Sequence, residues 1–310
     1  MTESMVENKN DRNELENPLV SVIVATYKRN AELKKAICSL LSQSYTNIEI
    51  VIVDDNAEAH WNEVVSGIVE QAAVDSNMRI VHVKNETNQG SAKTRNTGIQ
   101  RASGEYICFL DDDDIYLEDK VKNQVEHIIK SGADYCITDL NLFSEDDRLI
   151  DVRKRDYIKS DNPDELLKYH LRNHITGTDT MMFKKEYLVK IGGFPPIDVG
   201  DEFYLMKEAI CGCGKFSYLP RCDVKAYVHT ESEGLSSGES KIAGENSLFE
   251  YKKQFFDRLD RKTIRYIKMR HFAVLAFAEI RRKKYAGFIK NAACSFIAAP
   301  YGCIRTLVKR

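Results

Sequence analysis

The chain has 310 residues, 43% hydrophobic and 30% charged, so it can bury a large core and has the composition of an ordinary globular protein. No uninterrupted apolar run reaches the roughly 18 residues needed to span a bilayer, and no basic segment followed by an apolar core marks a signal peptide at the N-terminus. The eight cysteines are scattered without a disulfide framework, which is typical of a reducing compartment. We therefore expect a cytoplasmic protein.

The first third of the chain alternates strand and helix patterns. A polar, aperiodic stretch at 1–17 is expected to be a disordered leader. An apolar strand is predicted at 20–25, an amphipathic helix at 31–43, and a second apolar strand at 48–53 that ends in Asp54. Strand, helix and strand within about 35 residues indicate the βαβ unit of a parallel sheet, whose strand ends open onto a ligand crevice.

The same alternation continues with a predicted helix at 61–75 and a strand at 79–84. Residues 88–102 then form a glycine-containing loop that runs into a helix. Such a loop offers backbone N–H groups and a positive helix end to anions, and Lys93 and Arg95 add charge. The alternative is an ordinary helix cap with a solvated basic face.

An apolar strand predicted at 106–110 ends in four consecutive aspartates, at 111–114. Adjacent carboxylates repel one another by about 1 kcal/mol per pair even in water, so the cluster needs a counter-charge. Mg²⁺ or Mn²⁺ would supply it, since both prefer oxygen ligands and bridge carboxylates to phosphates. A solvated acidic loop or helix start is the alternative. Polar groups at three strand ends, Thr26, Asp54 and Asp111, favour a nucleotide crevice.

The middle of the chain, at 130–200, carries further strand patterns. Strands are predicted at 134–142 and 178–183, and the segment 175–180, ITGTDT, carries hydroxyls suited to sugar contacts. Hydroxyl-rich segments are equally common in edge strands, so both interpretations stay open.

Six segments together resemble the inverting family 2 glycosyltransferases with the GT-A fold, over residues 18–237. In order they are VSVIVATYKR at 20–29, IEIVIVDDNA at 48–57, NQGSAKTRNTGIQRASGEYICFLDDDD at 88–114, IGGFPP at 191–196, GDEFYLM at 200–206 and YVHTES at 227–232. Each segment alone is weak, but their order and spacing are specific. The resemblance implies an α/β fold with a mostly parallel central sheet flanked by helices. Its nucleotide-sugar half would span 18–115, its acceptor half 116–237, and a helical region 238–310 would follow.

The resemblance also implies roles for individual residues around the nucleotide. The base and ribose pocket would be lined by Ala25, Thr26, Tyr27 and Arg29. Asp54 would form a hydrogen bond with the base, and Asp55 would lie nearby. Lys93 and Arg95 would lie beside the diphosphate.

A metal site is implied in the same way. Asp111 and Asp113 match the DxD pair, with Asp113 as the ligand of Mn²⁺ or Mg²⁺ and Asp112 or Asp111 on the ribose. His229 stands where family members often supply a further metal contact. For a lone histidine, the alternative is a surface residue without a metal.

The catalytic base is expected at the pair Asp201 and Glu202, where the family usually shows Glu-Asp. The alignment puts Glu202 at the base position, and either carboxylate can accept a proton if a partly buried site tunes its pKa. Glutamate is one methylene longer, so Asp201 stays a candidate. Two acids at the start of a helix predicted at 202–210 also have a purely structural explanation.

The implied reaction is a metal-dependent, inverting sugar transfer from a nucleotide sugar, in particular a UDP-sugar, to a hydroxyl of a glycan or lipid-linked saccharide in cell-surface polysaccharide synthesis. Two alternatives stand against it. A sugar nucleotidyltransferase would want a glycine-rich, arginine-containing loop after the first strand, where ATYKRN has no glycine. A catalytically inactive nucleotide-sugar-binding module would be expected to lose the metal carboxylates or the base, and both are present.

The last 60 residues, 251–310, carry 16 Lys and Arg against 3 Asp and Glu. Aromatic and aliphatic residues at near-helical spacing interrupt these charges, a pattern typical of a helix in a membrane interface. We expect this region to bind the anionic inner face of the cell membrane, so that the protein is peripheral there. Helices packed on the catalytic domain are the alternative, and nucleic acid is not expected as a partner.

Overall fold

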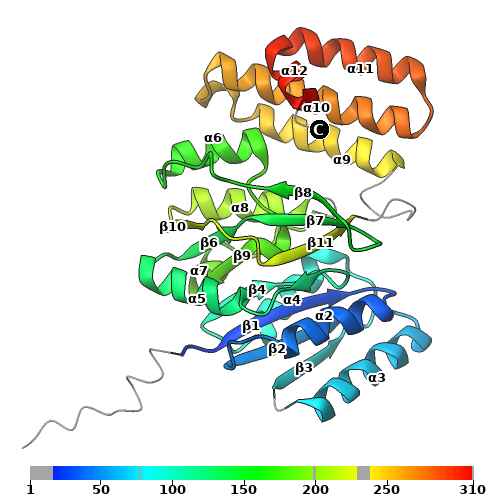
Figure 1. The fold of residues 1–310 in the computed structure, drawn as a ribbon, viewed down its shortest axis with the longest axis vertical. Coiled ribbons are helices and arrows are strands. Elements are labelled where there is room, and N and C mark those ends of the chain that lie inside the picture. The colour runs from blue at the N-terminus through cyan, green and yellow to red at the C-terminus, as the bar shows by residue number, and fades with distance from the viewer. Residues whose placement is uncertain (1–16, 77, 198–199, 229–237, 309–310) are drawn as a thin grey trace, which may run out of the picture. The chain divides into compact units, whose positions relative to one another are not determined.

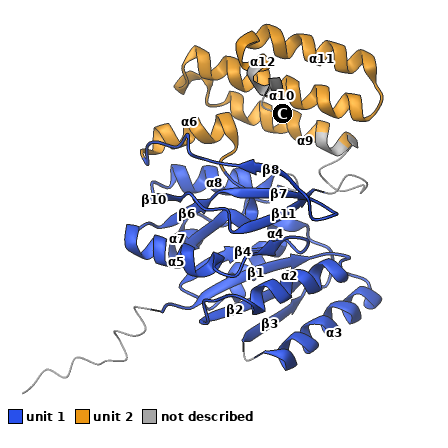
Figure 2. Cartoon of the chain, in the orientation of Figure 1, with its two compact units in different colours: residues 1–161, 176–228 blue, residues 162–175, 229–310 orange. Residues whose placement is uncertain are grey.

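The computed structural model describes residues 17–76, 78–197, 200–228 and 238–308 (Figure 1). The chain divides into two compact units, shown in Figure 2. The first comprises Met1–Asp161 and Thr176–Val228, and the second comprises Asn162–Ile175 and His229–Arg310. The leader predicted at 1–17 lies, apart from Asn17, outside the described residues, as does His229. The predicted domain boundaries stay a prediction.

A seven-stranded sheet organises the first unit, in the order β10-β6-β9-β4-β1-β2-β3. Its strands are β1 (Val20–Thr26), β2 (Ile48–Asp54), β3 (Arg79–Lys84), β4 (Tyr106–Phe109), β6 (Tyr135–Thr138), β9 (Met181–Lys184) and β10 (Phe216–Leu219). Strand β1 pairs in parallel with both β2 and β4, so the chain changes its direction of winding at β1. In open α/β sheets, ligands bind at this switch point, beyond the carboxyl ends of the strands.

Helices cover the sheet of the first unit (Figure 1). They are α2 (Ala31–Leu41), α3 (Ala59–Asp75), α4 (Ser91–Arg101), α5 (Lys120–Ser131), α7 (Lys185–Lys190) and α8 (Asp201–Cys211), with a short 3₁₀ helix, η1 (Thr178–Thr180). Helix α4 packs against β1 so closely that a Cβ at Gly98 would lie 2.4 Å from Cγ2 of Ile23. Glycine at this position therefore lets α4 approach the sheet.

The prediction of one strand at 134–142 is wrong, because this segment forms two strands, β6 and β7, that belong to different sheets. After β6 the chain leaves the large sheet and enters a second one, ordered β5-β11-β7-β8. The strands of this sheet are β5 (Ile115–Tyr116), β7 (Leu140–Ser144), β8 (Leu149–Arg153) and β11 (Val224–Val228). The break falls at the buried Asp139, whose Oδ1 accepts hydrogen bonds from Arg155 N at 2.8 Å and Tyr218 Oη at 2.6 Å. The strand predicted at 178–183 likewise begins with η1 before β9.

The second unit is helical within the described residues. Its elements are α6 (Pro163–Asn173), α9 (Gly238–Lys253), η2 (Phe256–Arg258), α10 (Arg261–Arg281), α11 (Tyr285–Ala298) and α12 (Pro300–Val308). Asp260 caps the start of α10, since its Oδ1 accepts a hydrogen bond from Thr263 N at 2.9 Å. The helix buries Ile267, Met269 and Leu275. None of the described helices combines the length and the apolar composition that a membrane crossing requires.

Candidate active site

The acidic loop after β4 is held by the loop that follows β1. The Tyr27 N–H donates to Asp112 Oδ2 at 3.2 Å, and Arg29 Nη2 donates to Asp113 Oδ2 at 2.6 Å. Arg29 Nε also lies 3.5 Å from Asp112 Oδ1. Burial and the adjacent Asp113 nevertheless raise the pKa of Asp112 to about 6. The ends of the neighbouring parallel strands β1 and β4 thus meet in one charged network at this edge of the sheet.

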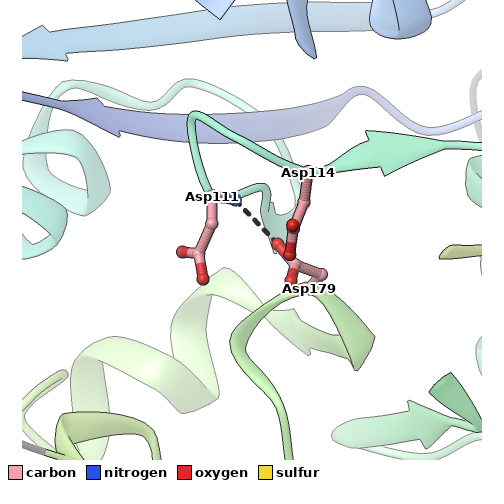
Figure 3. Close-up of side chains that lie close together, drawn as sticks. All are labelled: Asp111, Asp114 and Asp179. Carbon is pink, nitrogen blue, oxygen red and sulfur yellow. Dashed lines mark hydrogen bonds between the residues drawn. The ribbon is translucent and has the colours of Figure 1, made fainter. Parts of the chain in front are cut away.

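Three aspartates gather beside this network (Figure 3). Oxygen atoms of Asp111, Asp114 and Asp179 all lie within 4.8 Å of one another, and Asp179 Oδ1 accepts a hydrogen bond from Asp111 N at 2.7 Å. Burial, together with the Asp179 carboxylate, raises the pKa of Asp114 well above its ordinary value. Carboxylate oxygens are the donors that Mg²⁺ and Mn²⁺ prefer, so a divalent cation fits this part of the site.

Asp179 is a residue that the sequence reasoning missed. It comes from η1, in the segment whose hydroxyls suggested sugar contacts, and it is buried. The available signal was an acid directly before a buried strand, since a buried carboxylate needs a partner or a cation. The predicted metal residue Asp113 faces Arg29 instead of this cluster, whereas Asp111 belongs to it.

Arg95 connects the acidic loop to the predicted catalytic pair. Its Nη2 donates to Asp111 Oδ1 at 2.7 Å and its Nη1 to Asp201 Oδ2 at 2.5 Å. Ser91 Oγ, one turn earlier on α4, also donates to Asp201 Oδ2, at 3.0 Å. The sequence led us to expect Arg95 beside the diphosphate. In the structure its guanidinium joins two carboxylates, one from the acidic loop after β4 and one from α8.

The two acids at the start of α8 have different surroundings. Asp201 is buried and accepts hydrogen bonds from Arg95, Ser91 and the backbone N–H of Glu202. Glu202 is half-buried, and burial together with the Asp201 carboxylate raises its pKa to about 7. A carboxylate with a pKa near neutrality both releases and accepts a proton readily, which is what a general base requires.

The residues predicted around the base and ribose follow β1 and β2. Asp54 is fully buried, and its Oδ1 accepts from the backbone and side-chain nitrogens of Asn56 at 3.0 and 2.7 Å. Its Oδ2 is buried and has no hydrogen-bond partner within the described part of the chain. Tyr27, by contrast, is 46% exposed, so its ring is available to a ligand. Ala25 is partly exposed and Thr26 is buried.

Asp55 fixes the loop that leads into α4. Its carboxylate accepts hydrogen bonds from Asn85 Nδ2 at 2.8 Å, Gln89 N at 2.9 Å and Gly90 N at 3.0 Å. Asp55 therefore positions the start of α4, where Lys93 is exposed.

Replacing Arg95 by Met should lower the free energy of unfolding by about 3–5 kcal/mol, because the partly buried Asp111 and the buried Asp201 would lose the guanidinium that both contact. Urea denaturation of the two proteins would measure the difference. Arg101→Met is the matched control, since Arg101 is exposed at the other end of the same helix. Equal losses in the two variants would contradict a bridging role for Arg95.

Comparison with known proteins shows to which family the chain is similar. The family model described as Glycosyl transferase family 2 matches residues 21–192, more than half of the chain. The chain is 30% identical over 171 residues to the putative teichuronic acid biosynthesis glycosyltransferase TuaG of Bacillus subtilis. This alignment covers 54% of this chain and 63% of TuaG. It is 36% identical over 124 residues to the UDP-Glc:alpha-D-GlcNAc-diphosphoundecaprenol beta-1,3-glucosyltransferase WfaP of Escherichia coli, covering 38% of this chain and 47% of WfaP. The matched segments thus span only about half to two thirds of these relatives.

Solved structures give the fold. Staphylococcus aureus TarS 1–349 in complex with UDP-GlcNAc superposes with a TM-score of 0.56 at 17% identity and 91% coverage of both chains. The mannosyltransferase PcManGT of Pyrobaculum calidifontis, in complex with GDP-Man and Mn²⁺, superposes with a TM-score of 0.55 at 17% identity, covering 94% of this chain and 79% of that one. These similarities confirm the predicted GT-A fold. With the family match over residues 21–192, they establish that the chain belongs to glycosyltransferase family 2.

Proposed function

We propose that this protein transfers a sugar from a nucleotide-sugar donor to an acceptor hydroxyl, with inversion and with the help of a divalent cation. The observation that carries the proposal is the continuous network from Asp111 through Arg95 to Asp201 and Glu202, at the switch point of the sheet. It joins a set of oxygen ligands suited to a diphosphate-bound cation to a carboxylate suited to proton transfer.

The donor would lie across the carboxyl ends of β1, β2 and β4. Asp54 Oδ2 is buried, lies 3.9 Å from His82 Nε2 and accepts no hydrogen bond from the described residues, which suits a hydrogen bond to the base. The exposed ring of Tyr27 suits the ribose side. A UDP-sugar is favoured because the relative WfaP carries UDP-Glc in its name.

The cation would be held by Asp111, which lies in the cluster with Asp114 and Asp179, and by Asp113, whose carboxylate would have to turn from Arg29, with His229 as a further ligand. When bound, a divalent cation offsets the negative charge that develops on a diphosphate leaving group. Asp112, whose oxygens contact the Tyr27 N–H and Arg29, would hold the ribose.

Glu202 would take the proton from the attacking hydroxyl, and Asp201 would act as its positioning residue. Arg95 and Ser91 hold Asp201 in place, and the nearby negative charge of Asp201 helps to raise the pKa of Glu202. A single displacement from the opposite face then inverts the anomeric centre, whereas retention by double displacement would need a nucleophilic carboxylate against that carbon.

Slow donor hydrolysis tests the function directly. The purified protein with Mn²⁺ would be screened against UDP-, GDP- and dTDP-sugars, and NMR would follow the anomeric proton of the first sugar released. We expect one nucleotide class to be hydrolysed with inversion. Release of none would favour the inactive binding module, and formation of a nucleoside triphosphate from donor and pyrophosphate would favour a nucleotidyltransferase.

The acceptor is proposed to be a glycan or lipid-linked saccharide in cell-surface polysaccharide synthesis. The names of TuaG and WfaP support this, the first through teichuronic acid biosynthesis and the second through a diphosphoundecaprenol-linked acceptor. An acceptor of this kind would be reached at the cytoplasmic face of the membrane, with the C-terminal region as the anchor to anionic lipid.

A further inference from the structure

Helix α11 has an apolar face that nothing in the described chain covers. Large side chains point outward along it, and two more follow on α12. They are Tyr285, Ile289, Phe296, Ile297, Tyr301 and Ile304, each between 49% and 80% exposed. We call these six residues the apolar face. On α11 the spacings of four and seven residues place Tyr285, Ile289 and Phe296 in one row, and Ile297 lies beside that row.

Helix α11 packs along α10 (Figure 2). The side of α11 opposite to the apolar face makes this contact, so the apolar face points away from α10. Ser295 is buried there and its Oγ donates to Met269 O at 2.9 Å, while Arg265 Nε donates to Ala298 O at 2.8 Å. Gly287 lies so close to Glu279 that a Cβ would be 2.9 Å from Cδ of that side chain. These contacts fix which side of α11 faces outward.

Charge identifies the partner. Residues 281–310 contain eight Lys and Arg and no Asp or Glu, and the basic residues Arg281, Arg282, Lys283 and Lys284 directly precede the apolar face. Glu239 of α9 already pairs with Arg282 and lies 3.9 Å from Lys284. A second copy of the chain meeting this face would therefore bring Arg281, Lys283 and Lys290 against their like charges. An anionic bilayer offers both an apolar interior for the six side chains and negative headgroups for the cations.

We propose that the apolar face is a membrane-docking surface that inserts side chains of α11 and α12 among the acyl chains of an anionic bilayer, parallel to its plane. The proposal specifies which residues would make the membrane contact given under the proposed function. It rests on the proposed function only for the biological reason to dock, a lipid-linked acceptor. Lys290, which lies among the apolar residues, reaches the headgroups along its own aliphatic chain.

Sedimentation of the full-length protein with vesicles tests the proposal. With vesicles of phosphatidylcholine containing 30% phosphatidylglycerol, we expect the protein to pellet at about 50 mM NaCl and to be released at about 500 mM, since salt screens the headgroup charge. The variant Ile289→Asn with Ile297→Asn should lose binding at least tenfold. The triple variant with Lys283→Gln, Lys284→Gln and Lys290→Gln should bind the vesicles more weakly, by about fivefold in affinity for each of these cations that contacts the headgroups.

Control substitutions in the first unit test whether vesicle binding depends on the apolar face or only on the number of exposed apolar and basic side chains. Ile150→Asn with Val189→Asn replaces two similarly exposed apolar side chains of the first unit, and Lys34→Gln with Lys122→Gln removes two exposed cations there. These controls should bind vesicles as the unchanged protein does. All variants should hydrolyse a donor in solution at the unchanged rate, so a failure of docking can be told apart from a failure of the proposed chemistry.

A fluorescence measurement tests the proposal independently of the Asn variants of the apolar face, which could fail to bind because they misfold. The chain's single tryptophan, Trp61, lies on α3 in the first unit, so Trp61→Phe with Phe296→Trp places the only indole on the apolar face. Its emission should shift to shorter wavelength on addition of the anionic vesicles. The proposal is overturned if no shift and no pelleting occur, if neutral phosphatidylcholine vesicles bind equally well, or if the face variants instead abolish a dimer in solution.

Discussion

Glu202→Gln is expected to lower the turnover number by roughly 10²–10⁴-fold while the donor dissociation constant changes little, because loss of a general base acts on the chemical step. The amide keeps the shape of the side chain and the start of α8, so the fold should be unchanged. Steady-state transfer or donor hydrolysis, with calorimetry for donor binding, measures the two quantities separately. The pH profile adds a third readout. Since the pKa of Glu202 is raised to about 7, the unchanged enzyme should lose activity as pH falls below that value, about tenfold per unit well below it.

Asp201→Asn distinguishes the two candidate bases. Asp201 is hydrogen-bonded to Arg95 and Ser91, so its loss should release Arg95 and reduce stability as well as rate. If Asp201→Asn removes the acidic limb of the pH profile and Glu202→Gln is close to the unchanged enzyme, the base is Asp201.

Asp113→Asn is expected to abolish Mn²⁺-dependent binding of UDP without unfolding the protein. An amide carries no charge for a hard cation, and the Asp113 side chain is 18% exposed and outside the hydrophobic core. Calorimetric titration of UDP in the presence of Mn²⁺, and again with a chelator, measures the metal-dependent part of the affinity. Circular dichroism checks the fold.

Asp119→Asn is the control for Asp113→Asn. Asp119 is an exposed aspartate directly before α5, and its Oδ1 accepts a hydrogen bond from Ser44 Oγ at 2.6 Å. This substitution should leave UDP binding unchanged. Unaltered Mn²⁺-dependent affinity in Asp113→Asn would show that the cation is held elsewhere, and Asp179→Asn would then be the next variant to measure.

The order of strands and helices in the nucleotide half could be predicted because each element carries its own signal. Buried parallel strands such as β1 and β2 are continuous apolar runs, and the helices between them have a clear apolar period. The break between β6 and β7 had no such signal. It depends on Asp139 and its partners Arg155 and Tyr218, which are 16 and 79 residues further along the chain.

The candidate site was predictable to a similar extent. The acidic loop and the pair Asp201 and Glu202 stand out as local clusters of charge. Asp179 does not, because its contact with Asp111 N spans 68 residues of sequence. The different surroundings of Asp201 and Glu202 are likewise invisible in the sequence, since they arise from Arg95, more than a hundred residues before them.

The division of the chain into two units bears on how the protein can be shortened. Helix α6 is inserted between β8 and η1, yet it belongs to the second unit, where Arg258 Nη2 donates to Asp164 Oδ1 at 2.6 Å and Arg270 Nη1 contacts Arg172 O at 3.3 Å. A chain cut after β11 would keep α6 and lose both arginines. Since η1, which carries Asp179, begins only five residues after α6 ends, such a truncation would place an unsupported helix directly before a residue of the candidate site. Point substitutions on α11 and α12 therefore separate surface docking from catalysis more cleanly than removal of the C-terminal helices.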